Sequence, residues 1–206
     1  MTAIRQRARG EEQKAERRRQ ILDAAEVRFE TRTFAEVSLA DIAADVGVTK
    51  AALYRYFASK ESLFIGLFDR AFAHLHEAAT TVDAASKADA LATIVLSSRL
   101  YCRLSAIMNT VLEANLDEET ARAFKKSVVA NLEQLAGLLV ERGVLDARNA
   151  VSDLLRVQEA LVGCWHMSHR SPIVASLVRE PEFQLLATDF EISLRAHIAA
   201  LFGPRP

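Results

Sequence analysis

Hydrophobic residues recur with helical spacing along almost the whole chain. In the first such segment Ile21, Leu22, Ala25 and Phe29 fall on one stripe and charged residues surround it, which predicts an amphipathic helix over residues 14–31. No stretch combines β-branched residues with strict alternation and hairpin turn residues. The pattern therefore predicts an all-α fold.

Three short helices are expected after the first one. Ser38 is placed to cap a helix that ends at Gly47, because glycine adopts the left-handed conformation without steric cost. Thr49 can cap a third helix over Lys50–Phe57, and Ser59 can cap a fourth. Helices this short need tertiary support, so we expect them to pack on the first helix as one small domain.

Beyond residue 84 the apolar pattern lengthens into a predicted helical bundle, which brings the total to about nine helices. The last helix should stop at Gly203, which is followed by a proline. The expected helices are 86–104, 105–115, 118–142, 150–169 and 182–202. The predicted organisation is a flexible basic arm (1–13), a small domain of short helices (14–60) and a larger helical domain (61–206).

Charge is distributed unevenly along the chain. Residues 1–60 carry 12 Lys/Arg against 9 Asp/Glu, whereas the rest carries 14 against 18. A basic arm favours contact with phosphates, and Arg5, Arg7 and Arg9 could reach a minor groove. The alternative is a solvated tail without a partner.

Composition narrows the class of protein further. Half of the 206 residues are hydrophobic, but no apolar run approaches the roughly 20 residues of a membrane-spanning helix, and the N-terminus lacks the apolar region of a secretory signal. We therefore expect a cytoplasmic protein with no membrane partner. Cys102 and Cys164 match neither a disulfide framework nor a metal pair, so they are predicted to be small buried residues.

The most informative run is SLADIAADVGVTKAALYRYFASK, from Ser38 to Lys60. A helix-turn-helix needs a small residue where its helices cross, a turn residue that tolerates positive φ, and apolar inner faces. Ala43, Gly47 and Leu53 meet these needs. The outer face of the third helix is then free to enter a major groove of DNA.

At TKAALYRYFASK the sequence resembles the signature of the tetracycline-repressor (TetR) family, in which a recognition helix runs into a fourth helix. The resemblance covers residues 15–65; further on, only the number and order of helices are similar. Tyr56 departs from the family signature, in which histidine is frequent at this position, but a tyrosine hydroxyl can also donate to a phosphate. The resemblance implies a homodimeric regulator of transcription that binds double-stranded operator DNA, by default a repressor released by a small-molecule effector.

Eight residues of this run are predicted to contact DNA. Lys50 is the expected base reader, because lysine can donate to guanine O6 and N7, and Ala51 could touch a thymine methyl. The others suit phosphate and sugar contacts. In the alternative interpretation the aromatic residues belong to the core, as Phe57 itself should, and the lysine is a plain surface charge. The full set is Ser38, Thr49, Lys50, Ala51, Tyr54, Arg55, Tyr56 and Lys60.

The resemblance also implies a dimer built from the last two helices, 150–169 and 182–202, although their apolar stripes could equally be monomer core. An effector pocket is implied among the middle helices, where polar groups in apolar company are candidates. For each of these groups, ordinary packing or solvent exposure is the alternative. The candidates are Tyr101, Arg103, Asn109, Glu113, Trp165 and His166.

Enzymatic, metal and cofactor functions have little support in the sequence. The common nucleotide-binding, hydrolase and metalloprotease motifs are absent. His166 and His169 share a helix face, but no carboxylate or cysteine completes a recognisable metal set. We therefore expect no enzyme, metal or cofactor. The alternative function is a helical interaction protein, or a nonspecific DNA-associated protein, without an effector response.

Overall fold

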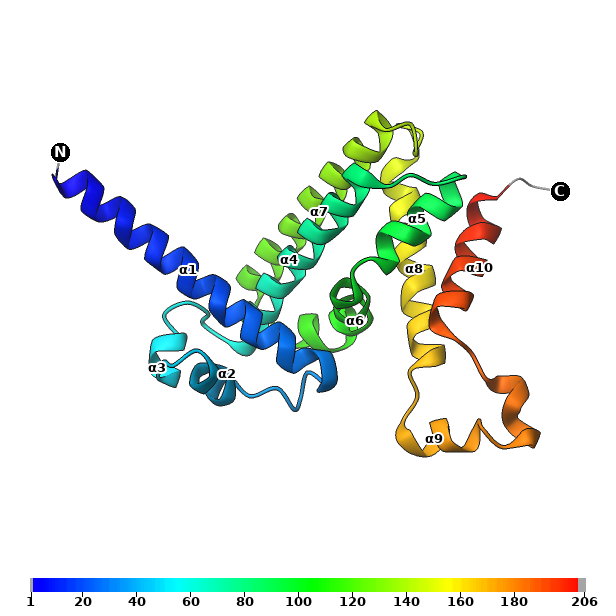
Figure 1. Cartoon of the computed structure of the whole chain (residues 1–206), viewed down its shortest axis with the longest axis horizontal. Coiled ribbons are helices and arrows are strands. Elements are labelled where there is room, and N and C mark those ends of the chain that lie inside the picture. The colour runs from blue at the N-terminus through cyan, green and yellow to red at the C-terminus, as the bar shows by residue number, and fades with distance from the viewer. Residues whose placement is uncertain (1, 204–206) are drawn as a thin grey trace. The chain divides into compact units, whose positions relative to one another are not determined.

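The computed structural model describes residues 2–203, with side chains from residue 10 onward, and the chain divides into two compact units, Met1–Leu67 and Phe68–Pro206. Ten α-helices, three short segments of other helical types and no strand occur in the described residues (Figure 1). This confirms the all-α prediction, with one α-helix more than the nine expected. None of these helices alone is long and apolar enough to cross a membrane; the pair Lys87–Leu96 and Arg99–Asn115 meets that test only jointly, with a bend of 84° between its members.

The first unit is a small helical domain built on α1 (Thr2–Thr31), α2 (Leu39–Asp45), α3 (Lys50–Leu53) and the beginning of α4 (Lys60–Thr81). The predicted stripe of α1 is buried, as are the large apolar residues of α2 and α3 and most of those at the beginning of α4. Phe29 and Phe34 meet the ring of Phe64 edge-on, with centroids 4.9 and 4.7 Å away. Helix α2 packs against both α1 and α3, which supplies the tertiary support that the two short helices need.

Two predicted boundaries in this unit are wrong. Helix α1 begins at Thr2 rather than at residue 14, because the N-terminal run is rich in Ala, Arg, Gln and Glu, which all favour helix. Helix α3 ends at Leu53 rather than at Phe57, since the N–H groups of Arg55 and Tyr56 bind carbonyls only three residues back, at 3.2 and 2.9 Å. The side chains of Arg5, Arg7 and Arg9 lie outside the described residues.

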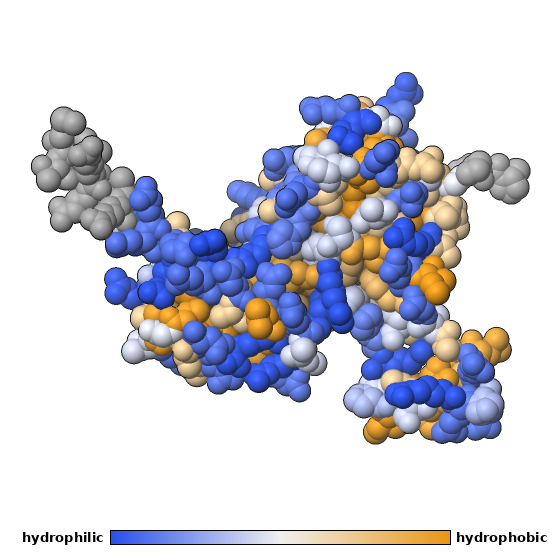
Figure 2. Space-filling model, viewed as in Figure 1, coloured by the Kyte–Doolittle hydropathy of each residue, from blue (hydrophilic) through white to orange (hydrophobic). Residues whose placement is uncertain are grey.

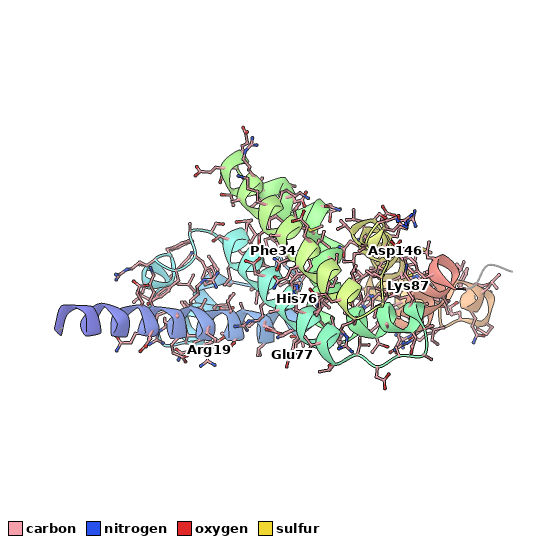
Figure 3. The ribbon with its side chains drawn as sticks, turned by 90° about the horizontal axis from the view of Figure 1, so that it is seen from above. Arg19, Phe34, His76, Glu77, Lys87 and Asp146 are labelled. Atoms are coloured by element: carbon pink, nitrogen blue, oxygen red, sulfur yellow. The ribbon has the colours of Figure 1, made fainter. Side chains whose placement is uncertain are left out.

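The second unit contains the rest of α4 and six further α-helices. Helix α7 lies alongside the 68–81 part of α4, which also carries His76 (Figures 1 and 3), and Ser127 Oγ donates to Asp69 Oδ1 at 2.7 Å between the two. Helix α10 packs against α5 and α8. The helices are α5 (Lys87–Leu96), α6 (Arg99–Ile107), α7 (Glu118–Glu141), α8 (Ala150–Ser168), α9 (Pro172–Leu177) and α10 (Phe190–Phe202).

The predictions for 118–142 and 150–169 are confirmed by α7 and α8, but three other ranges need correction. The expected helix 86–104 is broken at residues 97–98, because Ser98 accepts from the N–H of Tyr101 and so starts α6 anew. The expected helix 105–115 becomes a π-helical turn, Met108–Leu112, and a 3-10 turn, Glu113–Asn115. The expected helix 182–202 is a 3-10 segment, Pro181–Leu186, followed by α10.

Aromatic rings and one ion pair dominate the interior of the second unit. Phe68 and Phe72 of α4 contact the ring of Tyr101 with centroids 5.7 and 5.2 Å away. Asp153, a buried carboxylate of α8, accepts from Lys87 Nζ at 2.5 Å and so ties α8 to α5. Cys102 and Cys164 are both free and buried, as predicted.

Candidate nucleic-acid interface

Side-chain caps and one glycine shape the helix-turn-helix. Ser38 Oγ accepts from the N–H of Ala40 at 3.2 Å, and Thr49 Oγ1 accepts from the N–H of Ala52 at 3.1 Å, so both predicted caps are confirmed. Between them Gly47 adopts φ 67°, which an L side chain rarely tolerates. Each capping hydroxyl keeps its proton and can still donate to a phosphate.

Two arginines of α1 hold α2 in place. Arg17 Nη1 donates to the carbonyl of Val46 at 3.0 Å, just beyond the end of α2. Arg28 binds the Asp45 carboxylate through two nitrogens, at 2.5 and 2.8 Å, and reaches Asp41 at 3.4 Å. These hydrogen bonds hold the pKa of Asp45 below its ordinary value. Because two nitrogens of Arg28 bind the Asp45 carboxylate, the pair fixes the relative orientation of the two groups as well as their distance. The pair therefore helps to set the orientation of α2 relative to α1.

The structure gathers most of the predicted DNA contacts on one exposed segment. Thr49, Lys50, Ala51 and Arg55 are exposed on α3 and the turn after it, and 43% of Tyr54 is exposed. Lys50 Nζ lies 5.9 Å from the centroid of the Tyr54 ring. Small, basic and aromatic groups thus share one face, which suits entry into a major groove.

Lys60 and Phe57 have different surroundings from that face. Lys60 Nζ donates to the Ala35 carbonyl at 3.3 Å and lies 4.4 Å above the Phe34 ring. Burial lowers the pKa of this ammonium, against the opposing effect of Glu61. Lys60 therefore fastens the loop after α1, and its phosphate contact stays a prediction. Phe57 is buried, as expected for a core residue.

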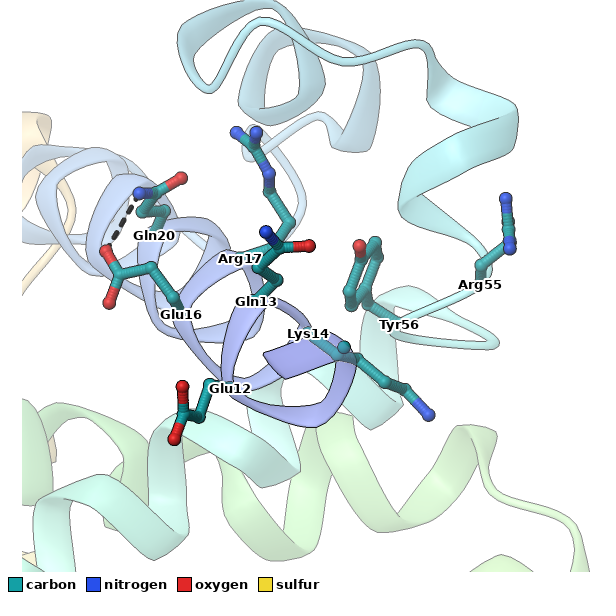
Figure 4. Close-up of a pocket in the computed structure, with 9 residues that line it drawn as sticks. Glu12, Gln13, Lys14, Glu16, Arg17, Gln20, Arg55 and Tyr56 are labelled. Carbon is teal, nitrogen blue, oxygen red and sulfur yellow. Dashed lines mark hydrogen bonds between the residues drawn. The ribbon is translucent and has the colours of Figure 1, made fainter. Parts of the chain in front are cut away.

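An open groove of about 900 Å³ runs between α1 and the turn after α3 (Figure 4). Glu16 in this groove is paired with Arg19, from which it accepts at 2.6 Å, and it also accepts from the neutral amide of Gln20 at 2.9 Å. Lys14 and Arg55 form no ion pair with another described residue. The groove is lined by Gly10, Glu12, Gln13, Lys14, Glu16, Arg17, Gln20, Arg55 and Tyr56.

Sequence reasoning named Arg55 and Tyr56 but missed the α1 side of this groove. The wall forms where α1 lies beside the 55–56 turn, a tertiary feature that local patterns do not reveal, and Gly10, Glu12 and Gln13 belong to it because α1 begins before residue 14. Unpaired cations beside a phenolic hydroxyl provide the donors that a phosphate backbone accepts.

The predicted effector residues occupy separate settings in the second unit. Tyr101 is buried and donates from its hydroxyl to Gln158 Oε1 at 2.6 Å, and burial raises its pKa. Asn109 is exposed, Arg103 is half-buried, and Glu113 accepts from Lys125 Nζ at 2.5 Å. A shared pocket for these residues stays a prediction.

The other two effector candidates lie near the end of α8. Trp165 stacks on His169 with centroids 3.7 Å apart, and the Phe190 ring meets the indole edge-on. His166 Nε2 lies 3.0 Å from the Ala106 carbonyl oxygen. Desolvation lowers the pKa of His169. Across the described residues, no three His, Cys, Asp or Glu side chains are grouped to hold a metal.

Comparison with known proteins decides the family. Residues 21–67 match the family model described as bacterial regulatory proteins, tetR family, and residues 61–203 match the one described as tetracyclin repressor-like, C-terminal domain. The chain belongs to the TetR family. It is therefore a DNA-binding regulator of transcription, with its helix-turn-helix in the first unit.

Individual relatives resemble the chain over its N-terminal part. Nucleoid occlusion factor SlmA of Idiomarina loihiensis is 45% identical over 58 residues, which are 28% of this chain and 30% of that protein. SlmA of Shewanella sediminis is 45% identical over 56 residues, 27% of this chain and 28% of the relative. The chain thus matches less than a third of the length of these curated relatives.

Solved structures share the fold over nearly the whole chain. The TetR-family regulator PfmR from Thermus thermophilus is 22% identical, and the match covers 90% of this chain and 99% of that one with a TM-score of 0.50. FadR from Bacillus subtilis, solved with stearoyl-CoA, is 18% identical, with 91% and 98% coverage and a TM-score of 0.52. At these identities the likeness shows the fold alone.

Proposed function

We propose that this TetR-family regulator is a homodimeric repressor that binds a near-palindromic operator and is released by a small-molecule effector. The exposed face of α3, with Lys50, Ala51 and Tyr54 free to meet base edges, is the observation that supports it most. Lys50 is the proposed base reader, and Thr49, Arg55 and the groove beside α1 serve the phosphates. This function involves no catalysis, and it places the protein with the chromosomal DNA in the cytoplasm.

A dimer explains the apolar surface that α8 and α10 leave exposed. Val151 and Leu155 of α8 and Ile192 and Leu201 of α10 are all large hydrophobic side chains with 40% or more of their surface exposed. Paired through these helices, two copies would present two recognition helices to successive major grooves, roughly 34–36 Å apart. An effector releases the DNA only if it binds more tightly to a dimer whose recognition helices have a different spacing than to the DNA-bound dimer.

The test begins with selection of bound duplexes from a random pool by the full chain. An inverted repeat among the enriched sequences supports the proposal. Equal affinity for every duplex at low salt, where electrostatic binding is strongest, overturns it in favour of a nonspecific DNA-associated protein. The nucleoid occlusion factor SlmA, 45% identical over 58 N-terminal residues, makes a nucleoid-associated role the second candidate function.

Variants then separate the roles on the selected site. Arg55→Ala and Lys14→Ala should each lower the affinity for all duplexes by a similar factor. Each should also reduce the slope of log affinity against log salt concentration by about one. Lys50→Ala should instead relax the preference at one base pair. Lys126→Ala, an exposed cation of α7, is the matched control and should leave binding unchanged. If Lys50→Ala and Arg55→Ala behave identically, the division into base reader and phosphate contact is wrong.

A further inference from the structure

Exposed apolar side chains are concentrated in the C-terminal quarter of the chain. Of the thirteen large exposed hydrophobic residues among those described, ten lie between residues 151 and 201. The two most exposed lie in the connection between α8 and α10, where 96% of Leu185 and 76% of Ile173 are exposed, and 59% of Leu186 is exposed there as well. Exposed apolar side chains concentrated in one segment indicate an interaction site.

This connection is a folded projection rather than an irregular loop. Ser171 caps α9, with Pro172 in its first turn, and the 3-10 segment Pro181–Leu186 follows. Only Val178 among these residues is buried. In Figure 1 the segment leads away from α8 and α10, and in Figure 2 hydrophobic side chains show on its surface.

Hydrogen bonds close the base of the projection. Arg170 Nη2 donates to the Leu186 carbonyl at 2.5 Å and lies 2.9 Å from Thr188 Oγ1. Thr188 Oγ1 in turn donates to the Met167 carbonyl at 2.9 Å. The two ends of the segment are thereby held together. Its backbone is ordered in the single chain, so a partner that binds its apolar side chains causes little further loss of conformational entropy.

We infer that residues 170–189 form an arm that packs on a second copy of this chain, beyond the contacts that α8 and α10 make. The inference rests on the proposed dimer. Met167 at the end of α8 and Ile192 at the start of α10 are also exposed and flank the arm in the sequence, so a partner that covers α8 and α10 can cover the arm as well. The arm carries Arg170 and Arg179 against three acids, and this near-neutral charge suits neither a nucleic acid nor an anionic membrane surface.

Sedimentation equilibrium of the full chain tests the arm. Leu185→Glu should weaken dimerisation by about tenfold or more, because a leucine that leaves water on dimerisation is replaced by a charge. Since 96% of Leu185 is exposed in the single chain, folding should not change, which far-UV circular dichroism checks. Val129→Glu is the matched control: 53% of Val129 is exposed on α7, outside the tract, and the dimer should be unaffected.

The outcomes distinguish the arm from the dimer itself. A wild-type chain that is monomeric at micromolar concentration overturns the proposed dimer and the arm with it. A wild-type dimer that Leu185→Glu leaves intact, or that Val129→Glu weakens equally, overturns the arm alone. Arg170→Ala removes the closed base but no apolar side chain, and it should also weaken the dimer, whereas Arg179→Ala should not; equal effects of the two overturn the role of the closed base.

Discussion

Gly47→Ala isolates the backbone requirement of the turn between α2 and α3. Gly47 adopts φ 67°, and a Cβ placed on it meets no atom within 4 Å. No steric clash with a neighbour therefore contributes, and the cost is that of holding an L-residue in the left-handed region, about 1–2 kcal/mol. The N–H groups of Gly47 and Val48 bind carbonyls of α2 at 3.1 and 2.9 Å, so the turn has little freedom to relax.

Gly137→Ala is the matched control, because the same methyl group is added with the opposite expectation. Gly137 lies exposed within α7, its φ is not positive, and a Cβ there also meets nothing within 4 Å. Alanine in a helix interior is preferred to glycine by roughly 0.5–1 kcal/mol. The two variants should therefore move the free energy of unfolding in opposite directions.

Urea denaturation followed by far-UV circular dichroism measures both changes. With a urea m value of about 2 kcal/mol per M, Gly47→Ala should lower the midpoint by roughly 0.5–1 M and Gly137→Ala should raise it slightly. Fluorescence of Trp165, which lies in the second unit, shows whether the two units unfold together. Shifts of the same sign in the two variants, or an unchanged midpoint for Gly47→Ala, would refute the backbone argument.

Three further changes test other parts of the structure. Arg28→Asp should weaken DNA binding by releasing α2, and the reversed pair with Asp45→Arg should restore part of it in a mobility-shift titration; failure of the reversed pair to recover any binding contradicts the positioning role. Phe72→Ala should lower the free energy of unfolding, measured by thermal denaturation, by about 3–5 kcal/mol, because removal of the buried ring leaves a cavity. Burial raises the pKa of Cys102 to about 12, so its thiol should resist alkylation at pH 8 until the chain unfolds. The stabilisation linked to that thiol is complete below its ordinary pKa and should be lost as the pH rises toward 12.

Local signals made the helix-turn-helix predictable from the sequence. A serine or threonine before an apolar run supplies its own cap, as Ser38 and Thr49 do, and Ser59 and Ser62 cap the start of α4 reciprocally at 3.0 Å. Glycine alone adopts positive φ cheaply, which fixes the turn at Gly47. Each of these interactions spans at most four residues, so the sequence contains all the information that they need.

Features that depend on tertiary contacts were not predictable in this way. No residue near Lys60 in the sequence indicates that its ammonium donates to the carbonyl of Ala35, 25 residues away. The break at residues 97–98 was missed because the apolar pattern continues across it, while Ser97 and Ser98 turn their hydroxyls to the backbone instead. Within the arm, Phe183 and Leu186 keep the spacing that predicts a helix from residue 182, although Pro181–Leu186 is a 3-10 segment and mostly exposed.

The order of helix α1 determines how the proposed DNA contacts should work. A disordered basic arm loses conformational freedom when it binds, which offsets part of the electrostatic gain. By contrast, Lys14 and Arg17 lie in the continuous helix α1, within the range predicted as helical, and Arg17 is already bonded to the end of α2. The phosphate contacts of the groove thus require ordering of side chains only. We therefore expect Lys14→Ala to lower affinity mainly through charge, so that the difference from the wild type disappears at high salt.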